Sequence, residues 1–352
     1  MALTIVSTIF VIGLLVLVHE LGHFVTAKLT GMRVDEFAIG FGPKLFSLRR
    51  GETIYSLRAV PLGGFNDIAG MNKDDNEAGE RGYCEKPVLS RMIVILAGSL
   101  MNFVLPVVLF FGIFFFSGID TPNPEPVFGT VLADKPAALA GVQDGDRVLA
   151  VNGIPVSSWQ DFTQVIQQEA LPEGTGEPQP VNLSLERGGE KLQVTVQPTY
   201  EKQTQRAVVG VMSSLNHRDV GLIESMQLAL QKTGTIIVMM LGALYNLLLE
   251  LSGTELAGPI GIARMAGEVA QMGIVPLLNF AAFLSLNLGI INLFPLPALD
   301  GGHFVTLCVE AVRGKPLSSE ALRNIQKVGV ALLVLLMLLA TANDIMRLFT
   351  GG

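Results

Sequence analysis

Two histidines and a glutamate interrupt a long apolar segment near the start of the chain. They lie in the stretch VLVHELGHFV, residues 16–25, and no charged side chain precedes Glu20. An apolar run of about 20 residues can cross the hydrocarbon core of a bilayer. Ionisable side chains at that depth cost free energy and usually mark a functional site. The segment therefore predicts a membrane helix that carries chemistry.

The composition extends this prediction to the whole chain. Half of its 352 residues are hydrophobic and only 16% are charged, below the quarter or so typical of soluble proteins. Four runs have the length of a membrane span: 3–24, 92–117, 277–299 and 328–349. We therefore expect a polytopic α-helical membrane protein with about four transmembrane helices. No basic, aromatic-interleaved patch points to nucleic acid, and the two cysteines do not form a disulfide framework.

Positive charge predicts the orientation of these spans. The segment 25–90 is rich in Lys and Arg, which favour the cytoplasmic side. The N-terminus and the polar region from Ile119 to about Ser225 are then outside. A cleaved signal peptide is the alternative for the first run. It is disfavoured because no Lys or Arg precedes Lys28 and no A-x-A site follows.

The stretch 226–250 leaves the number of crossings open. It is apolar enough to be a fifth span, but a crossing there would invert the third span and move its C-terminal end away from the depth of the two histidines. We therefore predict a helix that lies in the outer interface or against the bundle.

Two β-containing parts are also expected. Residues 34–65 read as a hairpin around Arg50-Gly51, either membrane-associated or an ordinary cytoplasmic hairpin. Strand, turn and helix signals from about 125 to 200 predict an inserted α+β module. The predicted divisions are a first membrane part, a PDZ-like domain, a linker with an interfacial helix, and a second membrane part: 1–118, 119–205, 206–276 and 277–352.

The HExxH spacing suggests a metal site. His19 and His23 are four residues apart and share a helix face, so both imidazoles can reach one zinc ion. Glu20 then serves as general base for a water that the metal activates. The alternative is a polar helix end at the interface, with both histidines bonded to headgroups or backbone.

A hydrolytic zinc needs a third protein ligand, and the stretch NLGIINLFPLPALDGGH supplies candidates. Asp300 follows a Pro-x-Pro break, and irregular backbone at membrane depth lines cavities or is buried in protein. His303 is a competing ligand, and a structural turn cap is another role for Asp300. Asn287 and Asn292 could hold the scissile carbonyl, although helix–helix hydrogen bonding is the commoner role for such residues.

These motifs together resemble a known family. HELGH at 19–23, GFGPKL at 40–45, PLGG at 61–64, NLFPLPALDGG at 292–302 and a PDZ-like module resemble the site-2 proteases, most of all the bacterial regulator of sigma-E protease type. The resemblance covers nearly the whole chain, although its tandem-PDZ member has two such domains and this chain has one. The single domain then either binds a peptide C-terminus or shields the cavity.

The resemblance implies an intramembrane Zn²⁺ endopeptidase of the bacterial cytoplasmic membrane. Its substrates would be transmembrane segments of single-span proteins, notably anti-sigma factors, with remnant signal peptides as a further class. It implies His19, His23 and Asp300 as zinc ligands, Glu20 as the catalytic residue and Asn292 near the metal.

The resemblance also gives the hairpin a role. It implies that residues 37–65 match a membrane-reentrant β-loop, and Gly63 and Gly64 would let a substrate strand approach closely. The competing function is a non-catalytic PDZ-bearing scaffold or a metal-binding transporter. It is disfavoured because all four active-site residues are present and no internal repeat is visible.

Overall fold

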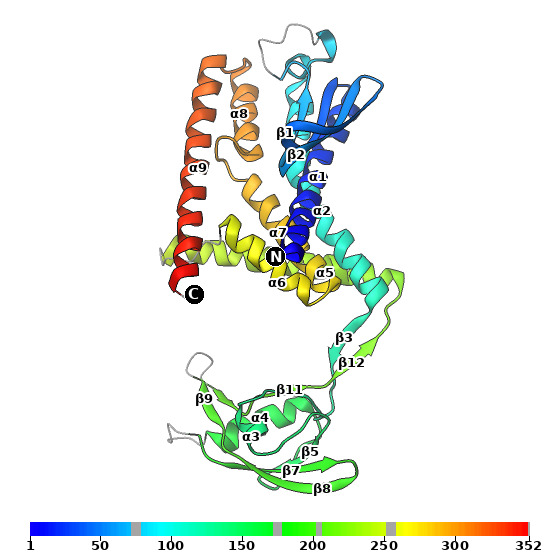
Figure 1. Ribbon diagram of the computed structural model, residues 1–352, viewed down its shortest axis with the longest axis vertical. Helices are drawn as coiled ribbons and strands as arrows, with labels where there is room; N and C mark the ends of the chain where they lie inside the picture. The colour runs from blue at the N-terminus through cyan, green and yellow to red at the C-terminus, as the bar shows by residue number, and fades with distance from the viewer. Residues whose placement is uncertain (72–78, 172–177, 202–205, 251–257, 351–352) are drawn as a thin grey trace. The chain divides into compact units, whose positions relative to one another are not determined.

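The computed structural model describes residues 1–71, 79–171, 178–201, 206–250 and 258–350, so part of the predicted linker, 251–257, lies outside the described residues. The chain divides into two compact units. One combines Met1–Phe116 with Gly221–Gly352, and the other is Ser117–Val220. The first unit carries the long helices (Figure 1).

Most of the first unit is helical. Its helices are α1 (Ala2–Leu29), α2 (Val88–Ser117), α5 (Leu222–Glu250), α6 (Pro259–Gln271), α7 (Ile274–Asn292), α8 (Asp300–Arg313) and α9 (Ser319–Thr350), with short 3₁₀ turns η1 (Gly79–Arg81) and η2 (Tyr83–Glu85). Within the described residues, α1, α2, α5, α7 and α9 are long and apolar enough to cross a membrane. The predicted polytopic helical membrane fold is confirmed.

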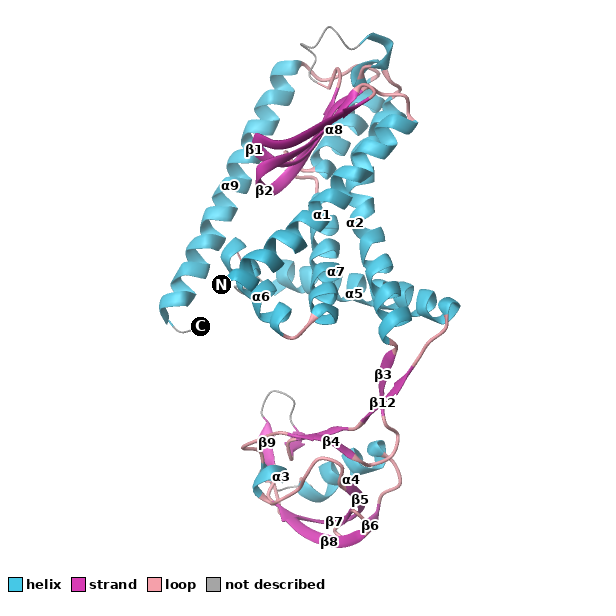
Figure 2. Cartoon of the chain, turned by 45° about the vertical axis from the view of Figure 1, so that its right-hand side comes forward, coloured by secondary structure: helices cyan, strands magenta, loops and turns pink. Residues whose placement is uncertain are grey.

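Helix α5 differs from the other four long helices. Its apolar window, Leu222–Asn246, has the lowest mean hydropathy of the five, 1.4. In both views it runs across the direction of α1, α2 and α7 (Figures 1 and 2). Lys232 ties it to α2 and α7: its Nζ lies 4.5 Å from the Phe110 ring centroid and donates to Asn279 Oδ1 over 2.7 Å. This is the kind of packing expected for 226–250 against the bundle, and its interfacial position stays a prediction.

Helices α1 and α2 approach each other closely at two glycines. A Cβ at Gly22 would collide with the Ala97 carbonyl, and a Cβ at Gly98 would collide with the His23 ring. Small residues permit such approach between membrane helices, where close packing takes over the role of the hydrophobic effect. The approach places the middle of α2 directly beside HELGH.

The predicted break after the third span is present. Helix α7 ends at Asn292 and α8 begins at Asp300, with Pro295 and Pro297 in the intervening turn. Proline cannot donate the helical hydrogen bond, which explains the interruption. Gly301 and Gly302 pack against carbonyls of this turn so tightly that a Cβ at either would collide. The chain therefore folds back and brings Asp300 to α1.

The predicted hairpin is confirmed as β1 (Val34–Arg50) paired antiparallel with β2 (Thr53–Ile68). The first half of β1 lies between two parts of β2: Phe37 pairs with both Asn66 and Tyr55. The last part of β2, near 64–68, pairs with β1 on one side and packs against α1 on another. This edge of the sheet is the one nearest HELGH.

The second unit is an α+β domain inserted between α2 and α5. Its main sheet has the order β6-β5-β7-β8, and helix α4 packs with it around an apolar core that includes Phe128 and Phe162. Residues 206–220, predicted within a linker, belong to this unit because β11 pairs with β4 and β12 with β3. The elements are β3 (Ile119–Pro122), β4 (Phe128–Val131), α3 (Pro136–Leu139), β5 (Arg147–Val151), β6 (Ile154–Pro155), α4 (Trp159–Ala170), β7 (Val181–Arg187), β8 (Glu190–Val196), β9 (Thr199–Glu201), β10 (Arg206–Val208), β11 (Val211–Ser213) and β12 (Leu215–Arg218).

An ion-pair cluster fixes the tip of the hairpin. Glu52 accepts from both terminal nitrogens of Arg81, at 2.7 and 2.8 Å, and from Lys28 Nζ at 2.5 Å. Arg81 and Lys28 hold the pKa of the Glu52 carboxyl at about 2. Because this pKa is lowered on folding, the ion pairs persist at neutral pH and weaken only as the pH falls toward 2.

Replacing Glu52 by Gln should loosen the hairpin at neutral pH. We expect tryptic cleavage at Arg49 and Arg50 to accelerate about two- to fivefold, the modest effect typical of partly exposed ion pairs. Glu80→Gln, at an exposed carboxylate in η1, is the matched control and should leave cleavage unchanged. Equal cleavage rates for the two variants would contradict the tether.

Candidate metal centre and active site

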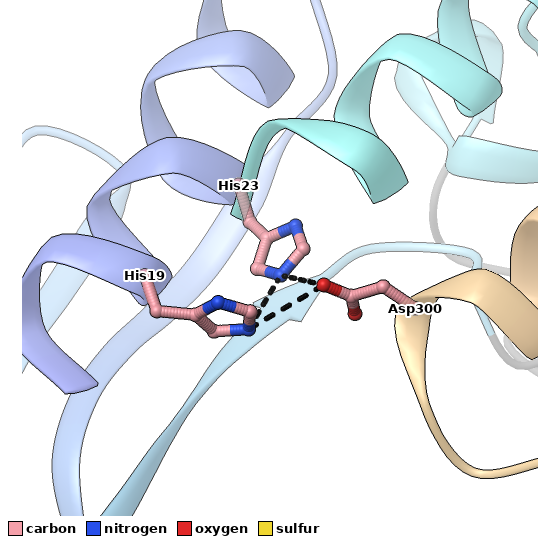
Figure 3. A group of neighbouring side chains, drawn as sticks. All are labelled: His19, His23 and Asp300. Carbon is pink, nitrogen blue, oxygen red and sulfur yellow. Dashed lines mark hydrogen bonds and ion pairs between the residues drawn. The ribbon is translucent and has the colours of Figure 1, made fainter. Parts of the chain in front are cut away.

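Three ligand atoms converge between α1 and α8. His19 Nε2 and His23 Nε2 are 3.2 Å apart, and Asp300 Oδ2 lies 3.5 and 3.6 Å from them (Figure 3). Ligands at 2.0–2.1 Å from a tetrahedral metal are about 3.4 Å apart, so the three separations match the edges of one zinc tetrahedron. Within the described residues this is the one group of three or more potential ligands. It could hold a metal ion with one position open.

The neighbours of His23 and Asp300 prepare them for a metal. His23 Nδ1 lies 2.8 Å from the Val94 carbonyl and can only donate to it, which leaves the lone pair on Nε2. Ser99 Oγ donates to Asp300 Oδ2 over 2.8 Å. Both partners lie on α2. The two ligands are therefore oriented by a helix that provides none itself.

Asn102 of α2 completes this arrangement at His19. Its Nδ2 lies 3.2 Å from His19 Nδ1, while its fully buried Oδ1 has no partner among the described residues. With the two amide atoms exchanged, Oδ1 would accept from His19 Nδ1–H. The lone pair of His19 would then lie on Nε2, facing His23 and Asp300. The unsatisfied oxygen thus fits a site built for a metal.

Glu20 lies beside this site and contacts the hairpin. Asn66 Nδ2 donates to Glu20 Oε2 over 2.7 Å and to the Glu20 carbonyl over 2.9 Å. A Cβ built on Gly64 would lie 2.8 Å from Glu20 Cγ, so the absence of a side chain there is needed for the contact. Gly63 adopts φ +116° and packs against the Phe41 ring. Gly64, the last residue of the PLGG segment, therefore lies directly against the candidate base.

The other sequence candidates form no side-chain hydrogen bond or ion pair with this group among the described residues. His303 is one turn along α8 and lines a separate cavity of about 260 Å³ with the ion-paired Arg91 and Glu310. Asn292 ends α7, and neither it nor Asn287 makes a side-chain hydrogen bond with another described residue.

Sequence reasoning missed the supporting residues of α2. Gly98, Ser99 and Asn102 lie within an apolar span, so the two polar side chains were a readable signal of a buried site. The contact that Asn66 makes was not readable, because it depends on how the hairpin folds onto α1.

The similarity to known proteins agrees with this geometry. A family model described as "Peptidase family M50" matches residues 7–336. The chain belongs to this family. The regulator of sigma-W protease RasP of Bacillus subtilis is 32% identical over 426 residues, covering 98% of this chain and 99% of that protein. The zinc metalloprotease RasP of Geobacillus kaustophilus is 34% identical over 426 residues, covering 98% of each.

Family membership confirms the predicted resemblance. The chain is a metalloprotease of the site-2 type, and zinc, the predicted cofactor, is the metal of the family. This decides against the scaffold and transporter alternatives. Among solved structures, the PDZ domain of an SdrC-like protein from Listeria monocytogenes matches at 18% identity and a TM-score of 0.22, over 27% of this chain and 93% of that one.

Replacing Asn102 by Leu should weaken zinc binding about 10- to 100-fold, the usual cost of losing a partner of a metal-bound histidine. Asn102→Asp, which keeps an acceptor, should lose much less. Zinc affinity is measured by chelator competition on the detergent-solubilised protein. Asn279→Leu, which removes an α7 asparagine bonded to Lys232 instead, is the control. Unchanged zinc affinity in Asn102→Leu would refute the role.

Proposed function

We propose that this M50 metalloprotease is an intramembrane endopeptidase that cleaves transmembrane segments of single-span membrane proteins. One observation supports it above the others. Three candidate ligand atoms lie at zinc-tetrahedron spacing, two of them on the apolar helix α1 and the third at the start of α8, and Glu20 beside them bonds to the hairpin. His19, His23 and Asp300 would hold the zinc ion, leaving a fourth position for the reaction.

When bound to His19, His23 and Asp300, a zinc ion would supply Lewis-acid chemistry for the scissile carbonyl and for the attacking water. Glu20 accepts the proton of the attacking water and returns it to the leaving amine as the C–N bond breaks. Ser99 and the Val94 carbonyl keep Asp300 and His23 in place during these steps. Burial of the ligand side chains, which are 12–16% exposed, excludes bulk water.

The hairpin would supply the substrate in a cleavable form. A helical substrate hides its carbonyls in its own hydrogen bonds, so it must be extended before attack. Pairing with the β2 edge would hold it extended through main-chain hydrogen bonds. Gly63 and Gly64 lack side chains that would hinder this approach, and Asn292 would help to position the peptide.

The names of the relatives support a proposal for the substrate class and the location of the chain. The Bacillus subtilis protein is named as a regulator of sigma-W protease. We assign anti-sigma-type membrane proteins as the main substrates, with remnant signal peptides as a second class. The chain would reside in a bacterial cytoplasmic membrane, with the Ser117–Val220 unit outside, where it could bind a peptide C-terminus.

Replacing Glu20 by Gln should abolish cleavage while zinc is retained. General acid–base catalysis contributes about 10²–10⁴-fold, and the loss should be at least that large. Cleavage is followed with a reporter that carries one apolar transmembrane segment, and zinc is measured by elemental analysis. A near-parental rate in this variant would exclude the mechanism.

The metal ligands are tested by stoichiometry. The parent should bind about one zinc per chain, and Asp300→Ala should lose it or bind it far more weakly, because a hydrolytic site uses three protein ligands. His303→Ala, three residues along the same helix, is the control and should keep its zinc. Loss in His303→Ala with retention in Asp300→Ala would reverse the ligand assignment.

The orientation is tested with a membrane-impermeant thiol reagent on intact cells, after Cys84 and Cys308 are replaced by Ser. A cysteine at Glu190, the exposed first residue of β8, should be labelled from outside. A cysteine at Arg50, at the hairpin tip, should react only after permeabilisation. The reverse pattern would invert the topology derived from positive charge.

A further inference from the structure

Asn66 is the one hairpin side chain shown to bond to the candidate base. It lies on the last part of β2, opposite Phe37. Its Nδ2 donates twice to one residue: to Glu20 Oε2 at 2.7 Å and to the Glu20 carbonyl at 2.9 Å. A carboxylate and a carbonyl both accept, so only the NH₂ group can make these bonds. The orientation of the Asn66 amide is therefore determined, unlike that of Asn102.

This orientation leaves the Asn66 oxygen without a partner. Oδ1 is buried and accepts no hydrogen bond from the described residues. A buried acceptor without a hydrogen bond costs free energy. A bound ligand that donates a hydrogen bond to it would remove this cost. Exchanging the amide atoms cannot satisfy it, because that would set an oxygen against the Glu20 carboxylate.

The surroundings indicate which donor arrives. The strand near 64–68 forms its ladder with β1 alone, and the absence of a side chain at Gly64 lets this strand lie directly against Glu20. A peptide held here in extended form would present backbone N–H groups to this edge. A main-chain N–H is also the donor that every peptide substrate carries, whatever its side chains.

We propose that Asn66 is a positioning residue with two functions, an inference that rests on the proposed peptidase function. Its Nδ2 holds Glu20 in the orientation needed for proton transfer. Its Oδ1 accepts a backbone N–H of the bound substrate next to the scissile bond. Through Asn66, binding of the substrate strand is thus coupled to the orientation of the Glu20 carboxyl group.

Two variants separate these functions in the purified, zinc-loaded full chain. Asn66→Asp keeps an acceptor but loses the donor and sets a second carboxylate against Glu20. We expect kcat to fall about 10- to 100-fold, part of the general-base contribution, with KM near the parental value. Asn66→Leu loses both groups, so kcat should fall and KM should rise by about tenfold. The neighbouring exposed Asp67→Ala is the control and should resemble the parent.

A chemical change in the substrate tests the acceptor directly. The probe is the transmembrane reporter with single N–H groups near the scissile bond replaced by ester oxygen. At one position the ester should raise KM for the parent and for Asn66→Asp but not for Asn66→Leu. No such position would overturn the acceptor role.

The remaining outcomes are also decisive. Zinc content and thermal midpoint are measured for each variant, and both should match the parent. If Asn66→Leu is misfolded, the nearly isosteric Asn66→Asp still reports on the donor through kcat. Parental kcat and KM in both variants would overturn the inference while leaving the peptidase intact. A parent that cleaves no reporter would instead overturn the proposed function, and the inference with it.

Discussion

The polar atoms around HELGH have to find their partners inside the protein, because lipid offers none. This requirement explains why the site depends on α2, which contributes no ligand. Val94 and Asn102 contact the outer nitrogens of the two histidines, and Ser99 contacts Asp300. These contacts depend on Gly22 and Gly98. Helices α1 and α2 are so close at these two positions that a Cβ atom at either would overlap the other helix. A small-residue contact between helices is thus the condition on which the candidate metal geometry depends.

The hairpin imposes a second constraint on the same helix. It is attached at its tip by Glu52, which bonds to Lys28 at the end of α1, and at its far edge by Asn66, which bonds to Glu20. Two attachments along one helix restrict how far the sheet can shift without breaking one of them. The distance between the strand edge and the base is therefore set by α1 itself. The proposed extension of a substrate beside Glu20 would depend on this fixed distance.

Sequence reasoning identified the three residues that the structure brings together, and the hairpin, because their signals are local. Ionisable residues in an apolar run are conspicuous, and a Pro-x-Pro break before Asp300 identifies where a membrane helix ends. The contact of Asn66 with Glu20 is different, since it joins residues 46 positions apart and no periodicity encodes it. The end of the inserted domain was missed for a related reason. Strands as short as Val211–Ser213 carry no pattern, and only pairing with β4 assigns them.

The break between α7 and α8 shows how an acidic ligand can be placed among apolar helices. If α7 and α8 formed one continuous helix, successive side chains would point in different directions around its axis, and no turn of the chain would face α1. Ending α7 at Asn292 places the backbone of the following turn outside a regular helix, which would be costly in lipid. The Phe294 carbonyl accepts from Leu296 N, and Gly301 and Gly302 bring the start of α8 directly against this turn. Asp300 is then the first residue of α8, where the helix dipole favours a negative charge. The same turn that interrupts the helix therefore both shields its own backbone and presents a carboxyl group to the two histidines.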